Sequence, residues 1–157
     1  MRSRGQNALE YMMTYGWAIL VVLVVGVLVW QMGILDLSRN ISPDKRGFSQ
    51  VTPLDWSLSQ GPAADLVIVV QNNAGTILTL NTVVATIETG GSGVCSLDTL
   101  VPITNFRPGS TLKLDFSNCP VDASSGDYYR VDVTLDYLNP GSGLTHTSTG
   151  VIWGPVS

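Results

Sequence analysis

The chain opens with a long apolar stretch. Residues 11–35, which are 25 residues from Tyr11 to Leu35, carry no charged side chain. At about 1.5 Å per residue they would form a helix of about 37 Å, which is long enough to cross a bilayer with some tilt. Arg2 and Arg4 precede this stretch, so we expect the short N-terminus on the cytoplasmic side and everything after Asp36 outside.

The rest of the chain alternates apolar and polar positions with a period of two. The clearest run is Tyr128 to Leu138, in which every second residue from Tyr129 is apolar or aromatic. This period predicts a strand with one face in a core. Residues 139–143 form a turn signal, so Leu144 to Trp153 should return as the second strand of an antiparallel hairpin with a five-residue loop. Other strands are expected at 48–52, 55–58, 65–71, 76–88 and 110–116.

The two patterns together predict an α+β protein. A long N-terminal hydrophobic helix over residues 6–42 would precede an antiparallel immunoglobulin-like β-sandwich head over 48–157. Pro43 should end or bend the helix. The charged residues behind it predict a hinge over residues 43–47.

The apolar stretch has no secretory cleavage site behind it. The next alanine after Ala18 is Ala63, so an Ala-x-Ala site is absent there and the helix should stay with the mature protein. A basic and small-residue junction lies in front instead, where Arg4-Gly5 meets Gln6. We predict a cut between Gly5 and Gln6, which removes residues 1–5 as a leader.

This layout resembles the class III signal peptides of archaeal type IV pilins. The matching features are Arg4-Gly5 before the cut, Gln6 after it, Glu10 four residues further on, and the uncharged helix. The resemblance covers residues 1 to about 35. It implies a precursor held in the cytoplasmic membrane, a prepilin peptidase, and an ATP-driven assembly machine on a membrane platform. It implies a structural subunit of an extracellular pilus that forms a helical homopolymer, with a role in adhesion or surface attachment.

Two alternatives stay open at the sequence level. The chain lacks the Gly-Ile-Gly-Thr-like start expected of archaellum subunits, but an archaellum-type motility filament shares the same polymer logic. A monomeric β binding module anchored by one helix is the other alternative. It needs no cut after Gly5 and leaves Glu10 unexplained.

Glu10 is the one carboxylate near the start of the apolar run. A charge at mid-membrane depth costs about 2.5–3.5 kcal/mol on insertion scales, and less near the interface. Cleavage would create a free amine on Gln6, and Glu10 of one subunit could pair with that amine on a neighbour. Such buried pairs set register better than they stabilise. The alternative is a solvated Glu10 at the membrane edge.

Two glycines in the helix are candidates for helix packing. Gly26 and Gly33 are seven positions apart and therefore share a face, where they permit close backbone approach. Glycine is also common in ordinary single-pass anchors, which is the other interpretation.

Charge excludes one class of partner. The chain has 8 basic and 12 acidic side chains, a net charge of −4, and loss of Arg2 and Arg4 would leave 6 against 12. No basic patch is present, so nucleic-acid binding is not expected. Asn40-Ile41-Ser42 is an N-glycosylation sequon on the outer side of the membrane.

Cys95 and Cys119 both fall in the outer domain, where a disulfide can form. A bridge across this separation would stabilise the domain by about 3–4 kcal/mol in the chain-entropy model. Two buried thiols are the alternative.

The sequence offers no catalytic motif. His146 is the single histidine, and no nucleophile motif accompanies it, so we expect a surface or packing residue. No His, Cys or Glu cluster has metal-ligand spacing, and the loop Gly90-Gly91-Ser92-Gly93 lacks the ending of a phosphate-binding loop. We therefore expect no enzyme activity, no metal and no cofactor.

Overall fold

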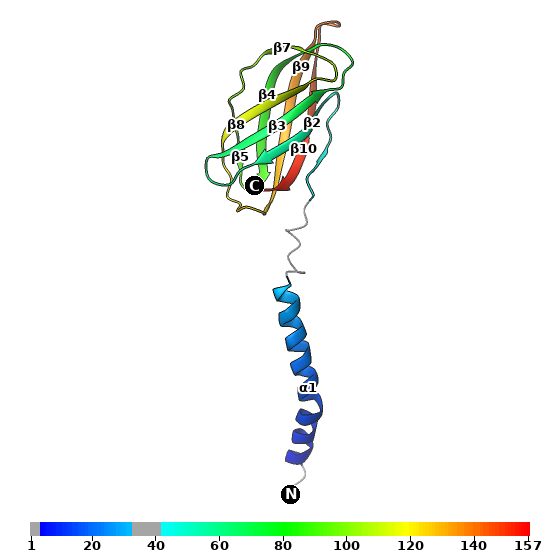
Figure 1. Cartoon of the computed structure of the whole chain (residues 1–157), viewed down its shortest axis with the longest axis vertical. Helices are drawn as coiled ribbons and strands as arrows, with labels where there is room; N and C mark the ends of the chain where they lie inside the picture. Colours follow the sequence, from blue (N-terminus) through cyan, green and yellow to red (C-terminus); the bar gives the residue numbers. More distant parts are fainter. Residues whose placement is uncertain (1–3, 33–41) are drawn as a thin grey trace. The chain divides into compact units, whose positions relative to one another are not determined.

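A computed structural model of the chain describes residues 4–32 and 42–157, with side chains from Met13 onward in the first range. The chain divides into two compact units, Met1–Leu37 and Ser38–Ser157. The first unit holds one helix, α1, over Arg4–Gln31, and the second is built of β-strands (Figure 1). The predicted combination of an N-terminal apolar helix and an antiparallel β domain is confirmed.

α1 has the composition of a long uninterrupted apolar helix. Its 28 residues include no proline and no charge from Met13 to Gln31. A helical bond from the Met32 amide to the Leu28 carbonyl, 2.9 Å long, closes the last turn. The predicted helix extended to residue 42, but residues 33–41 lie outside the described part of the chain.

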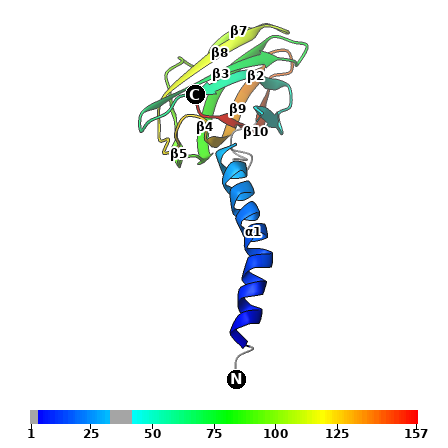
Figure 2. The same ribbon diagram turned by 60° about the horizontal axis from the view of Figure 1, so that its bottom comes forward.

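Two antiparallel sheets make up the β domain. One has the strand order β1-β10-β9-β4-β5, with β7 also paired to β4, and the other has the order β2-β3-β8-β6. In both views of the ribbon, β2, β3 and β8 lie in one layer, and β4, β9 and β10 lie in another (Figures 1 and 2). The strands are β1 (Asp44–Arg46), β2 (Val51–Leu58), β3 (Ala64–Asn72), β4 (Leu78–Thr89), β5 (Gly93–Val94), β6 (Ser96–Leu97), β7 (Ile103–Phe106), β8 (Thr111–Cys119), β9 (Tyr128–Asn139) and β10 (Leu144–Pro155).

The core lies between the two layers. On β9 the alternation predicted from sequence holds, because Tyr129, Val131, Val133, Leu135 and Tyr137 are all buried. The facing sheet contributes inward side chains from β3 and β8 to the same apolar cluster. The run at the centre of β3 looked continuously buried from its sequence. In the structure it has one buried face, carrying Leu66, Ile68 and Val70, and one half-buried face.

The predicted hairpin is present. β9 and β10 pair antiparallel from Tyr128 opposite Pro155 to Asn139 opposite Leu144. The loop is one residue shorter than expected because Asn139 joins the ladder. The Asn139 carbonyl accepts a hydrogen bond from the Gly143 amide at 2.8 Å, and its side-chain oxygen accepts one from the Gly141 amide at 3.0 Å.

The structure differs from the sequence prediction at the start of the domain. Asp44–Arg46, in the range expected to be a hinge, is strand β1 and pairs with β10. Its charges mark a sheet edge, where charged side chains are common. Lys45 points inward, and its ammonium group donates a hydrogen bond to the Pro53 carbonyl. The two strands expected at 48–52 and 55–58 are replaced by one strand, β2, whose register shifts between Pro53 and Asp55.

Candidate functional site

The described part of α1 exposes a long apolar surface. From Met13 to Gln31 the helix has a mean hydropathy of 2.2, and none of this segment is buried. At about 1.5 Å per residue these 19 residues extend about 28 Å, close to the thickness of a hydrocarbon core. An exposed apolar surface of this extent is rare on soluble monomers and indicates a membrane or a protein partner. By length and composition, α1 can be a membrane anchor or a signal sequence.

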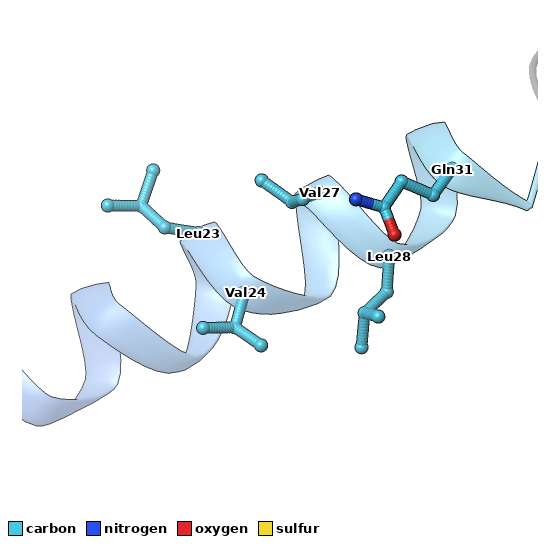
Figure 3. Close-up of a pocket in the computed structure, with 5 residues that line it drawn as sticks. All are labelled: Leu23, Val24, Val27, Leu28 and Gln31. Atoms are coloured by element: carbon cyan, nitrogen blue, oxygen red, sulfur yellow. The ribbon is translucent and has the colours of Figure 1, made fainter.

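The side chains of α1 form ridges suited to packing against another helix. Leu23, Val27 and Gln31 follow one another along one side, and Val24 and Leu28 lie along the other (Figure 3). Each row has the four-residue spacing whose ridges fit into the grooves of a second helix. These five side chains line a hollow on the helix surface, and the Gln31 amide is the polar group in its otherwise aliphatic lining.

Gly26 leaves open space on the helix. A Cβ atom built there, or at Gly16, meets no heavy atom within 4 Å. The fold of the single chain therefore does not require glycine at either position. A close approach by another helix would give a reason for glycine. Gly33, the second member of the predicted packing pair, lies outside the described residues.

The predicted processing site lies at the beginning of α1. The helix starts at Arg4, so Gly5 and Gln6 belong to its first turn, in which the backbone amides have no acceptor within the helix. Glu10 lies in the same helix. The side chains of Gln6 and Glu10 are outside the described part of the chain, and so is the sequon residue Asn40. The amine–carboxylate pairing and the glycan remain predictions.

Cys95 and Cys119 form a disulfide with an S–S distance of 2.06 Å, as the sequence predicted. Cys95 lies between β5 and β6, and Cys119 ends β8. The bridge therefore joins a segment that leaves one sheet to a strand of the other. Both cysteines are buried. An antiparallel β-bridge pairs Gly91 with Val121 and joins the same two segments of the chain.

His146 lies on β10 with its side chain exposed, and its ring centroid is 5.7 Å from that of Tyr137. Within the described ranges, no three His, Cys, Asp or Glu side chains are grouped so as to hold a metal ion.

Two features of the β domain were missed from the sequence. Asn72 reads as part of a surface turn but is fully buried. Arg46, Arg130 and Trp153 line a hollow that forms only because β1 pairs with β10. The period-two pattern on β9 gave the outward direction of Arg130. The missing signal was the edge strand.

No protein-family model matches the chain, and a search of curated proteins finds no match.

Proposed function

We propose that the chain is a structural subunit of an extracellular filament of the type IV pilus kind. The observation that carries this proposal is the contrast between the two units. The β domain has an apolar core of its own, whereas the apolar side chains of α1 from Met13 to Gln31 are almost all exposed. A helix of this composition needs apolar surroundings, and copies of the same helix can supply them.

The leader and the first residues of the mature chain support the same proposal. The resemblance in Arg4-Gly5, Gln6 and Glu10 to class III signal peptides of archaeal type IV pilins implies cleavage by a prepilin peptidase. The precursor would wait in the cytoplasmic membrane with α1 spanning it. An ATP-driven machine would then move the helix from lipid into a bundle of helices. In that bundle, Glu10 would meet the new amine of Gln6 on a neighbour and set the axial register.

We infer that the β domain is an immunoglobulin-like head. The order β2-β3-β8-β6 matches the A-B-E-D sheet of that fold, and β10-β9-β4 matches its G-F-C sheet. The antiparallel edge strand β1 and the extra pairing of β7 with β4 are additions to this pattern. In a filament the head would form the outer coat, where surface attachment takes place.

The N-terminus of the mature protein tests this proposal. Mass spectrometry of material shed from the cell surface should find Gln6 as the first residue. Such a chain keeps α1 and loses only residues 1–5. A first residue of Met1, or one beyond Ser38, would contradict the proposal, because the helix would then be unprocessed or absent from the assembled protein.

A further inference from the structure

A hollow of about 230 Å³ lies on the outer face of the first sheet, where β1, β10 and β9 run side by side. Its lining combines two guanidinium groups with two aromatic rings and one valine. The residues are Arg46, Tyr128, Arg130, Val151 and Trp153. All of them belong to the β domain.

Strand register builds this hollow. Val151 and Trp153 on the central strand β10 flank Ile152, which is fully buried, so both point outward. Arg46 of β1 lies opposite Val151, and Arg130 of β9 lies opposite Trp153. Directly opposed residues have Cβ atoms about 4.5–5.5 Å apart. The two arginines therefore border the apolar floor from its two sides.

The hollow contains two of the few basic side chains of the domain. Residues 42–157 contain ten acidic side chains and five basic ones, and two of the five line this hollow. Within residues 4–32 and 42–157, Arg46 has no ion pair. Arg130 forms an ion pair with the Asp132 carboxylate at 3.6 Å, a separation that is too long for a hydrogen bond. The donors of Arg46 are therefore available to a ligand, and those of Arg130 are held only by this long ion pair.

Guanidinium groups recognise carboxylates through paired hydrogen bonds. Asp132 lies opposite Val151 and Asp44 lies opposite Trp153, so both carboxylates are close to the floor. These two negative charges disfavour a ligand with more than one negative charge. A single carboxylate is the best match.

The half-buried rings of Tyr128 and Trp153 add flat apolar surface. The volume is below the roughly 300–1,000 Å³ of pockets for drug-sized ligands, so it suits one ring.

We propose that this hollow binds a six-membered ring that carries one carboxylate. A uronic acid unit of a polysaccharide and an aromatic carboxylic acid share this chemistry. In either ligand the carboxylate lies between Arg46 and Arg130, and the ring rests on Trp153. The proposal does not depend on filament assembly.

The test uses the full chain in detergent micelles, labelled with 5-fluorotryptophan. The chain has four tryptophans, and a Trp153→Phe variant assigns the ¹⁹F resonance of Trp153. Four probes are titrated: methyl glucuronoside, benzoate, methyl glucoside and acetate. At least one ring carboxylate should shift the Trp153 resonance saturably, whereas the neutral glucoside and acetate should not. The tighter of the two ring carboxylates identifies the source of the ligand.

Arginine variants then test the recognition. Arg46→Gln should weaken binding of the ring carboxylate at least tenfold. Arg107→Gln, an exposed arginine in the turn before β8, should leave it unchanged. Arg46→Lys keeps the charge without the paired donors and should give an intermediate affinity. Equal binding of glucoside and glucuronoside, no shift with either ring carboxylate, or unchanged affinity in Arg46→Gln with an intact ¹⁹F spectrum would each overturn the proposal.

Discussion

Asn72 shows how one buried polar side chain organises a whole turn. Its amide nitrogen donates to the carbonyls of Thr76 at 2.8 Å and Phe106 at 2.7 Å, and its side-chain oxygen accepts from the Ala74 amide at 2.9 Å. The residue thereby joins the end of β3 to the segment that leads into β4 and to the end of β7. Buried polar groups are stable only when they are hydrogen-bonded in this way.

We predict that Asn72→Ala destabilises the β domain by about 3 kcal/mol, because three backbone groups lose their hydrogen-bond partner, one in a buried bond and two in part-buried bonds. The matched control is Asn73→Ala. Asn73 is exposed, and its side chain donates to the Thr52 hydroxyl in an exposed hydrogen bond, so the loss of this side chain should cost no more than about 0.5 kcal/mol. Denaturant unfolding of the full chain in detergent, followed by near-UV circular dichroism, measures both. Equal losses in the two variants would show that Asn72 does not have this role.

We predict that the β domain loses stability at alkaline pH because of Tyr129. Burial raises the pKa of its hydroxyl well above the ordinary value, and the nearby Asp55 carboxylate raises it further. The folded state therefore keeps the proton where an unfolded tyrosine, with a pKa of about 10, releases it. The stabilising contribution is fully present below about pH 10. It declines above that pH by up to about 1.4 kcal/mol per pH unit.

The measurement compares the wild type with Tyr129→Phe between pH 8 and pH 11. Below about pH 9 the free energies of unfolding of the two proteins should differ by a constant. Above pH 10 the wild type should lose stability more steeply than the variant. Parallel curves across the whole range would contradict this assignment to Tyr129.

At the scale of elements, sequence pattern predicted the long strands and failed on the short ones. β9 and β10 each have 12 residues. The alternation of β9 is long enough to give its core face, and the turn signal after it gave the antiparallel direction of β10. β5 and β6 have only 2 residues each, and β1 has 3. Pairing with a neighbour defines such strands, and the neighbour is known only once the sheets have formed.

The candidate sites also differ in how far the sequence could predict them. The disulfide followed from two cysteines in one outer domain, because a pair has a single possible connection. The burial of Asn72 and the hollow beside Trp153 depend on contacts between distant strands, such as Arg46 with Val151. No local pattern carries that information.

Helix α1 gives a prediction at the element scale, which rests on the proposed assembly. Gly26→Ile should impair association between copies, because a branched side chain would occupy the space that a neighbouring helix needs. Gly16→Ile is the matched control: Gly16 has the same open surroundings but lies on a different face from Gly26. Both chains should enter the membrane normally. Surface filament yield, compared with the amount of precursor in the membrane, distinguishes them, and equal yields would exclude Gly26 as a packing position.

At the scale of the whole molecule, the chain consists of two units that differ in where their apolar side chains lie. The β domain buries its apolar side chains within itself and is fastened by a disulfide. α1 presents nearly all of its described apolar side chains to the outside. Lipid can satisfy the helix in the precursor, and neighbouring copies can satisfy it in an assembly. The proposed function depends on the second environment.

Electron cryomicroscopy of fibres from the cell surface tests this claim most directly. The account predicts a fibre whose core is a bundle of α1 helices, with side-chain density that begins at Gln6 and with β domains on the outside. Fibres that contain this chain but lack a helical core would contradict it. Cells that produce the mature chain only as membrane-bound monomers would contradict it as well.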